Sequence, residues 1–381
     1  MPFYLKQGAV PPKRHTRFSK NDGSLYREEL VSRQGFSDIY SNLYHIHMPT
    51  EIVTVGDFLP LPLKPWEKQH HHHHLRTAQT PSKGDFISAK TPLFFNRDVV
   101  LSKIHVSLSM KDFYRNGNHD EVLFVHSGNG TLKSNLGYLD FHNGDYIVIP
   151  RGVIWQMEIS EPCKILAMET SGLVKTPHRY RNEHGQLLEH APFCERDIRT
   201  PVFNEPVDDE GEFRIDVKLT DGIQSYLYKH HPFDVVGWDG YYFPWIFNIN
   251  DFEPITGKIH QPPPVHQTFQ APGVVICSFV PRLFDYHPEA IPAPYAHSNV
   301  DSDEILYYVK GHFMSRKGIE EGSITYHPMG LPHGPQPGKT EDSIGAKETT
   351  ELAIMIDTFQ PLQMTQDCKS IDDPDYPFSW L

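Results

Sequence analysis

Three side chains near the C-terminal end of the chain have the types and spacing of a metal-binding set. The segment HSNVDSDEILYYVKG (297–311) begins with His297 and places Glu304 at the start of a strand-like run. The segment GSITYHPMGLPHGP (322–335) carries His333. Two imidazoles and one carboxylate on one face of an octahedron are the ligands of non-haem Fe(II) oxygenases, and they leave positions open for substrate and dioxygen. We therefore expect these three residues to bind one metal ion.

The spacing around these residues recurs in the N-terminal half without the histidines. Tyr114 lies seven residues before Glu121, as His297 lies seven before Glu304, and Trp155 takes the place of His333. Such a match predicts two copies of one supersecondary unit, of which only the second keeps the ligands. The positions that correspond one to one are Glu121, Gly128, Gly144, Pro150, Gly152 and Trp155 in the first copy and Glu304, Gly311, Gly322, Pro328, Gly330 and His333 in the second.

Short β-like runs make up most of the segments that look ordered. They are rich in Val, Ile, Tyr and Phe and are bounded by turn residues. The 33 prolines and 26 glycines argue against long helices, and residues 27–44 are the best candidate for one. The runs predict an all-β-dominated chain with few short helices, built as two β-sandwich or jelly-roll barrels. They cover residues 101–109, 121–128, 145–150, 164–171, 213–219, 273–281, 304–311 and 352–359.

The two copies divide the chain into two predicted domains. Residues 1–235 are expected to form an N-terminal β-sandwich domain with a degenerate, metal-free barrel. Residues 236–381 are expected to form the domain that carries the metal site. The proline-bearing stretch at about 173–270 is interpreted as a long linker between the copies.

Length and charge narrow the classes of partner. The chain has 381 residues and a formal net charge of -13, without a basic stripe, which disfavours nucleic acid and anionic membranes as partners. No apolar run approaches the roughly 20 residues that span a bilayer, and the N-terminus lacks the apolar region of a secretory signal. We therefore expect a cytoplasmic protein. Four separated cysteines are interpreted as buried or incidental thiols.

The combined spacing HxNxxxxE and GxxxxxPxGxxH is the signature of the cupin fold. A cupin without a metal is the alternative, because Asn299 stands where many cupins place another histidine. An isomerase using Zn or Mn in the same pocket would want a fuller ligand set, and Asn299 counts against it. A storage or regulatory cupin is a third alternative.

Longer segments resemble the homogentisate 1,2-dioxygenase family, in particular its shorter bacterial branch. The resemblance runs nearly end to end and is most specific between residues 236 and 359. It implies a bicupin fold, a homo-oligomer (a trimer or a hexamer), and Fe(II)-dependent cleavage of homogentisate with O2 to maleylacetoacetate, a step of tyrosine and phenylalanine catabolism. The segments are PYAHSNVDSDEILYYVKGHF (294–313), GSITYHPMGLPHGP (322–335), RHTRFSKNDGSLYREEL (14–30) and LYHIHMPT (43–50).

The resemblance also implies roles for single residues. The iron ligands would be His297, Glu304 and His333, with His333 also contacting the substrate. The family's acid/base histidine lies upstream of the metal motif, where GKIHQPPPVHQTFQ (257–270) offers His260 and His266; the separation fits His260 better.

Two further positions that the family uses for substrate contact are His327 and Phe313. The family's larger branch has a tyrosine at the second of these positions, and a phenyl ring cannot donate a hydrogen bond. Another para-hydroquinone acid, such as gentisate, is therefore an alternative substrate.

Two histidine-rich segments and one aromatic segment are competing candidates. The run His70–His74 is interpreted as a loop or strand near the surface, and the HxH pair at 45–47 as part of a core strand. The aromatic segment 228–248 is interpreted as sandwich core, with a pocket wall near Tyr242 or Phe243 as the alternative.

Overall fold

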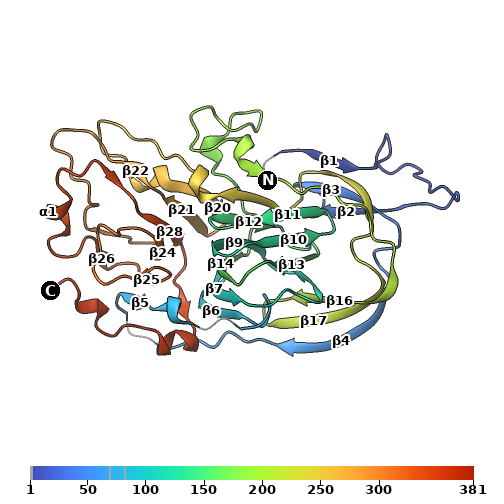
Figure 1. The fold of residues 1–381 in the computed structure, drawn as a ribbon, viewed down its shortest axis with the longest axis horizontal. Coiled ribbons are helices and arrows are strands. Elements are labelled where there is room, and N and C mark those ends of the chain that lie inside the picture. The colour runs from blue at the N-terminus through green and yellow to red at the C-terminus, as the bar shows by residue number, and fades with distance from the viewer. Residues whose placement is uncertain (1–2, 68–69, 81–82) are drawn as a thin grey trace.

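Antiparallel β-sheets account for nearly all the regular structure of the chain (Figure 1). The structure is a computed structural model that describes residues 3–67, 70–80 and 83–381. Within these ranges the single α-helix is α1 (Lys339–Ser343). The predicted all-β fold class with few short helices is confirmed. Short 3-10 turns cover Thr77–Gln79, His178–Tyr180, Glu195–Asp197, Ile249–Asp251, Pro263–His266, Gln366–Ser370 and Tyr376–Phe378.

Three sheets are built mainly from the first 250 residues. A four-stranded sheet has the order β1 (Leu5–Gly8), β18 (Val235–Gly240), β3 (Tyr40–His45) and β2 (Arg27–Ser32). A seven-stranded sheet has the order β11 (Gly137–Phe141), β10 (Gly130–Ser134), β13 (Trp155–Ile159), β8 (Phe113–Asn116), β16 (Glu210–Lys218), β17 (Gly222–His230) and β4 (Ile52–Pro60). An eight-stranded sheet has the order β15 (Ile198–Arg199), β19 (Trp245–Asn248), β12 (Asp145–Ile149), β9 (Asp120–Ser127), β14 (Cys163–Thr170), β7 (Val99–Val106), β6 (Lys90–Phe95) and β29 (Gln363–Met364).

A six-stranded sheet carries the C-terminal half. Its order is β20 (Gln267–Ala271), β21 (Val274–Phe279), β28 (Leu352–Thr358), β24 (Asp303–Lys310), β25 (Ile324–His327) and β5 (His73–Leu75). Two short pairs complete this half: β22 (Arg282–Leu283) with β27 (Glu348–Thr349), and β23 (His297–Ser298) with β26 (Pro332–His333).

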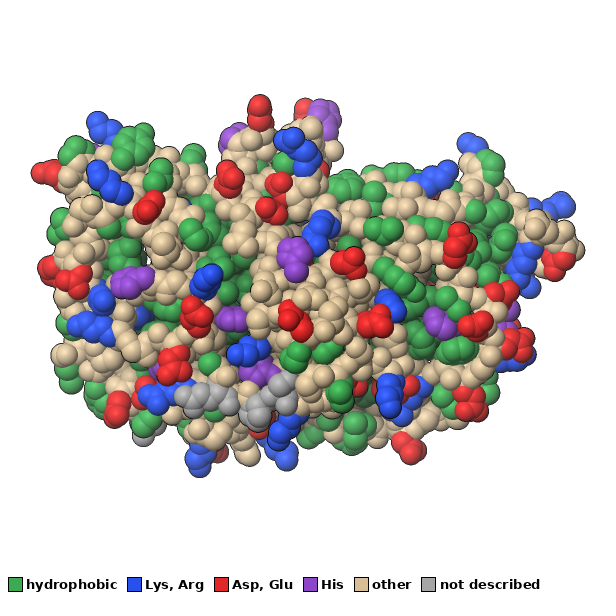
Figure 2. All heavy atoms as spheres, in the orientation of Figure 1, with side chains coloured by type: hydrophobic (Ala, Val, Ile, Leu, Met, Phe, Trp, Pro, Cys, Tyr) green, Lys and Arg blue, Asp and Glu red, His purple; other side chains and the backbone are tan. Residues whose placement is uncertain are grey.

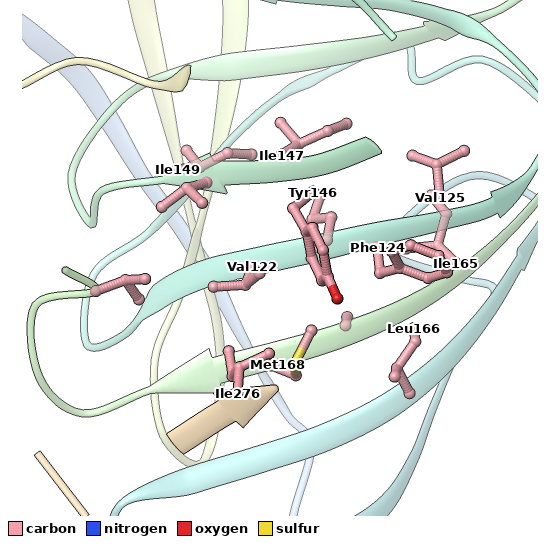
Figure 3. Close-up of a cluster of buried hydrophobic side chains, with 14 of the residues drawn as sticks. Val122, Phe124, Val125, Tyr146, Ile147, Ile149, Ile165, Leu166, Met168 and Ile276 are labelled. Atoms are coloured by element: carbon pink, nitrogen blue, oxygen red, sulfur yellow. The ribbon is translucent and has the colours of Figure 1, made fainter. Parts of the chain in front are cut away.

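One continuous hydrophobic cluster holds the sheets together. It includes buried side chains from the seven-, eight- and six-stranded sheets, such as Trp155, Phe124 and Ile276. Figure 3 shows its centre, where Val122 and Phe124 of β9 lie beside Tyr146 of β12. Removing this much apolar surface from water is the main stabilising contribution in a chain whose sheets have few helices to cover them.

Polar contacts also tie the eight-stranded sheet to the six-stranded sheet. The buried Tyr146 hydroxyl lies 2.9 Å from the Ser278 hydroxyl, and the Tyr307 hydroxyl lies 2.9 Å from His126 Nδ1. Because buried polar groups are costly without partners, these two contacts fix how the sheets face each other.

The strand predictions were confirmed, and the helix prediction was wrong. Each of the eight predicted runs coincides with a strand, namely β7, β9, β12, β14, β16, β21, β24 and β28. Residues 27–44 instead form the hairpin of β2 and β3, in which Arg27 pairs with His45 and Ser32 with Tyr40. Gln34, Gly35 and Phe36 adopt positive φ in the turn. The other edge of β3 pairs with β18, a partner about 190 residues away that local periodicity cannot reveal.

The stretch interpreted as a linker is part of the sheets, so that interpretation was wrong. Residues 173–270 contribute β15 to β20, and β16 and β17 extend the seven-stranded sheet. The domain division between residues 235 and 236 stays a proposal, and this position falls inside β18. Strands also cross between the halves, since β5 joins the six-stranded sheet and β29 joins the eight-stranded sheet.

The histidine run forms a buried edge rather than a surface loop. His70 is exposed, but His73 and His74 lie in β5 and are buried. Their Nδ1 atoms lie 2.9 Å from Asp372 Oδ2 and 3.3 Å from Asp373 Oδ2 respectively. The run therefore serves as a sheet strand that pairs with β25.

Of the HxH pair only His45 lies in the core as predicted, because His47 follows the end of β3 and is partly exposed. His45 is buried in β3, with Nδ1 2.7 Å from Asp234 Oδ1 and Nε2 3.0 Å from Glu29 Oε2. Burial alone would lower the pKa of His45, but the two carboxylates outweigh it and raise the pKa to about 9. Tyr242 and Phe243 both belong to the buried cluster.

The surface agrees with the charge pattern of the sequence. On the face in Figure 2, acidic and basic side chains are interspersed without a field of one sign. Among the described residues, no helix has the length and apolar character that crossing a bilayer requires. The four cysteines are free thiols, and three of them are buried.

Candidate metal centre

Strand pairing brings the three predicted ligands together. The two-stranded pair of β23 and β26 places His297 directly opposite His333. Glu304 is the second residue of β24 and pairs with His327 of β25. One ligand atom from each of His297, Glu304 and His333 lies within 4.8 Å of the others, which places all three around one point.

The distances and the burial suit a shared cation. His333 Nε2 lies 3.3 Å from Glu304 Oε1, and His297 Nε2 lies 3.8 Å from Glu304 Oε2. The His333 side chain is 1% exposed and that of Glu304 is 6% exposed, whereas His297 is 33% exposed and borders the cavity. The triad thus sits at the inner end of a solvent-reachable space.

Two observations show that the residues fit a metal ion. His333 Nε2 is buried and has no hydrogen-bond partner, although an unsatisfied polar atom in such a place is costly. Burial would raise the pKa of Glu304, but the surrounding His297, His327 and His333 hold it well below its usual range. A buried ring nitrogen without a hydrogen-bond partner and an ionised carboxylate are suited to ligating a divalent metal.

His327 lies behind the carboxylate. Its Nδ1 is 2.7 Å from Glu304 Oε1, and its Nε2 is 3.4 Å from the Tyr376 hydroxyl. Burial lowers the pKa of His327 to about 3, so the neutral ring donates from Nδ1 and accepts at Nε2. The ring is completely buried, and it stacks on His333 with 4.4 Å between centroids. These contacts give His327 the position of a residue that orients a ligand.

The N-terminal copy repeats this geometry with different side chains. Trp155 pairs with Tyr114 in the register of His333 and His297, and Ile149 pairs with Glu121 in the register of His327 and Glu304. Three matched glycine pairs have nearly equal positive φ: +99° at 128 and 311, +86° and +81° at 144 and 322, and +83° and +82° at 152 and 330. Only glycine adopts such angles freely, which explains why the spacing survives.

The buried acid of the first copy faces a cation instead of imidazoles. Glu121 accepts a hydrogen bond from the Tyr114 hydroxyl at 3.0 Å. Lys90 Nζ lies 3.8 Å from Glu121 and 3.0 Å from Glu169, and Lys218 Nζ lies 4.0 Å from Glu169, so ammonium groups face the two carboxylates. In this copy, where the candidate metal ligands are missing, a lysine ammonium group therefore lies beside the buried carboxylate of Glu121.

A cavity of about 430 Å³ opens beside the C-terminal triad. His297, Glu304 and His333 form one wall, and both candidate acid/base histidines line it as well. The space suits a small aromatic acid.

The two candidate acid/base histidines have different surroundings. His260 is half-exposed, its Nδ1 lies 3.4 Å from Asp285 Oδ2, and its ring meets Tyr295 edge-on with centroids 5.3 Å apart. His266 is 6% exposed, and burial with the nearby charge of Arg282 lowers its pKa to about 3. His260 is therefore the better placed of the two to exchange a proton with a molecule in the cavity.

Two other sequence positions differ in how they meet the cavity. Asn299 lines it. Phe313 is 8% exposed and packs edge-on against Tyr308 with centroids 4.7 Å apart. In the described structure the residues Met314, Ser315 and Arg316, rather than Phe313, border the space.

Sequence reasoning missed several polar groups that gather here. Asp357 of β28 pairs with Glu304 of β24 and lines the cavity, where burial and the Glu304 charge raise its pKa to about 8. His72 lies against the other side of the site, with its ring centroid 5.6 Å from that of His327 and 6.3 Å from that of His333. The available signal for Asp357 was a lone acid in the apolar strand LAIMIDTF. His72 belongs to the run that the sequence alone predicts to be a loop or strand near the surface.

Known proteins resemble the chain over its whole length. The family model described as homogentisate 1,2-dioxygenase N-terminal matches residues 85–249. A protein of Saccharolobus solfataricus, provisionally described as a dioxygenase, is 42% identical over 384 residues, covering 100% of this chain and 99% of its own. The homogentisate 1,2-dioxygenase of Legionella pneumophila (strain Corby) is 28% identical over 391 residues, covering 94% of this chain and 90% of its own.

A solved structure is similar at a greater distance. A cupin 2 conserved barrel domain protein from Leptotrichia buccalis matches with a TM-score of 0.36 and 8% identity, covering 77% of this chain and 99% of that one.

The all-β cupin fold and these relatives define the chain as a dioxygenase-like enzyme. It belongs to the homogentisate dioxygenase family. The resemblance that the sequence motifs indicated is thereby confirmed.

Proposed function

We propose that the protein is an Fe(II)-dependent ring-cleaving dioxygenase that converts homogentisate and O2 to maleylacetoacetate. The observation that carries this proposal is the meeting of two imidazoles and one carboxylate in the wall of a cavity of about 430 Å³, a space that suits a small aromatic acid. The homogentisate dioxygenase of Legionella pneumophila supports the choice of substrate, since it aligns over 94% of this chain.

His297, Glu304 and His333 would hold the iron. Iron held there would supply the redox chemistry that dioxygen needs, and a facial set of three ligands would leave coordination positions open for the substrate. The protein's part is to keep the ligand atoms in place. His327 orients the Glu304 carboxylate through the 2.7 Å contact at Oε1.

His260 is proposed to hold the proton of the substrate's phenol. Imidazole is a common acid/base group in enzymes, His260 lines the cavity, and Asp285 Oδ2 lies 3.4 Å from its Nδ1. Asp285 Oδ2 also accepts a hydrogen bond from the backbone N–H of Gln261 at 3.1 Å, which fixes the carboxylate. General acid/base groups contribute about 10²–10⁴-fold.

Oxygen uptake tests the proposal directly. The full chain is reconstituted with Fe(II) under nitrogen, and oxygen consumption is followed after adding homogentisate or gentisate. Uptake with homogentisate, together with the absorbance of a ring-opened product, is expected. A His333→Ala variant should show neither, because it removes a ligand. Iron binding without uptake with either acid would refute the proposal.

The proposal extends to the assembly and location of the enzyme. A homo-oligomer, as a trimer or a hexamer, and a cytoplasmic location are proposed on the family's grounds. Size-exclusion chromatography with light scattering measures the assembly.

A further inference from the structure

Two arginines border the cavity that contains the triad. Arg282 belongs to β22, and Arg316 lies in the loop between β24 and β25. A buried guanidinium keeps its charge, so each needs a partner that offsets the cost of leaving water. The two residues differ in whether the protein supplies that partner.

Arg316 is held by protein carbonyls at one end of its guanidinium, although its buried Nε has no hydrogen-bond partner. Its Nη1 donates to the carbonyls of Gly334 and Ser315, and its guanidinium lies over the Trp380 ring, 5.8 Å from the centroid. Burial would lower the pKa of Arg316, but Tyr308 and other neighbours outweigh it and raise the pKa. Because Gly334 follows His333, Arg316 serves to fix the loop that carries a ligand.

Arg282 lacks comparable partners. Its Nη1 donates to the Val280 carbonyl at 3.3 Å, and the rings of Phe279 and Phe284 lie 5.9 Å and 5.7 Å from Cζ. Among the described residues, no carboxylate oxygen lies within 4.0 Å of this guanidinium. Most of its five N–H donors are therefore free for a ligand.

Electrostatics agree with this contact pattern. Burial lowers the pKa of Arg282, and the more distant Glu351 and Asp285 offset only part of the change. The cavity is thus bordered by a guanidinium whose positive charge the protein does not fully compensate. A bound anion would supply the missing negative charge.

The geometry points to a carboxylate site: we propose that Arg282 binds the carboxylate of an aromatic acid whose ring reaches the triad. The planar guanidinium matches a carboxylate with two parallel hydrogen bonds, and Phe279 and Phe284 hold the fork in one orientation. The inference rests on the proposed function for the identity of the ring. It assigns the carboxylate, to which Phe313 cannot donate a hydrogen bond, to Arg282, which lines the cavity.

Binding of a charged and an uncharged ligand tests the inference. Isothermal titration calorimetry measures 2,5-dihydroxyphenylacetate and its methyl ester against the full chain, metal-free and loaded with Zn(II), under nitrogen. The wild-type protein should bind the acid at least about 10-fold more tightly than the ester, because a charge-assisted bidentate contact is worth that much. Arg282→Gln should remove the difference and leave ester binding within about 2-fold.

Matched variants separate recognition from general charge. Arg97→Gln removes one positive charge from a side chain that is 74% exposed and should keep the full preference for the acid. Arg282→Lys keeps the charge but loses the fork, so its preference should fall several-fold. This variant decides the matter if circular dichroism shows that Arg282→Gln is unfolded. An unchanged preference in it would then overturn the inference.

The outcomes also separate this inference from the proposed function. An Arg282-dependent preference for the acid in a protein that takes up no oxygen would support the carboxylate site and refute the dioxygenase proposal. Oxygen uptake by a wild-type protein that binds acid and ester equally would refute the carboxylate site alone.

Discussion

Replacing His327 by leucine tests whether the Glu304 carboxylate has to be held from behind. The ring is fully buried and donates from Nδ1 to Glu304 Oε1 across 2.7 Å. A hydrogen bond to a charged group contributes about 1.5–3 kcal/mol, which corresponds to a change of roughly 10- to 150-fold. Residues that orient a metal ligand typically change metal affinity by about 10–100-fold. We therefore expect His327→Leu to weaken metal binding by about that factor.

Competition with a chromophoric chelator measures the affinity for Co(II) or Fe(II) under nitrogen. His327→Asn should recover part of the loss, because its side-chain amide can donate from nearly the position of Nδ1. His312→Leu is the matched control, since His312 is an exposed histidine next to Gly311. The reasoning fails if folded His327→Leu binds metal as tightly as the wild type, or if His312→Leu weakens it equally.

Three further changes have defined outcomes. His260→Ala should bind metal normally in the chelator assay but lower kcat by about 10²–10⁴-fold; loss of metal binding would contradict its assigned role. Gly311→Ala should lower the free energy of unfolding in urea by more than about 1–3 kcal/mol, because φ is +99° and a Cβ would lie 2.2 Å from the Thr350 carbonyl oxygen. Gly318→Ala is the control and should lower it less, because φ is +70° there and the space around the new Cβ is open. His45→Gln should destabilise the protein by on the order of 3 kcal/mol at pH 6, because the folded pKa of about 9 exceeds the unfolded value. That difference should shrink as pH rises from about 6.5 through 9, and an equal loss in urea unfolding at pH 6 and pH 9.5 would refute the assignment.

Local patterns were enough to predict the strands and the three residues that the structure brings together at the candidate metal centre. The strand EILYYVKG and its partner GSITYH are almost continuously buried apolar runs next to glycine turns, and in their register Glu304 lies opposite His327. The same turns recur around Glu121, so the repeat was visible in the sequence without any knowledge of the pairing.

Long-range pairing decided what the sequence could not show. Residues 27–32 have helix-compatible letters, yet their partner is β3, which in turn pairs with β18 more than 190 residues further along the chain. His72 directly precedes β5, and Asp357 lies in β28. Both reach the site, but no residue spacing within one segment of the sequence could predict that they lie there together. The role of Arg282 could not be predicted from the sequence either, because its lack of a carboxylate partner is visible only in the folded cavity.

The order of strands in the six-stranded sheet sets a limit on when this protein can become active during synthesis. β28, from residues 352–358, lies between β21 and β24, while the opposite edge is supplied by residues 73–75. A ribosome must therefore release almost the entire polypeptide before Glu304 acquires its neighbours on both sides. Until then β5 has to wait for its partner β25, and β24 has to wait for β28.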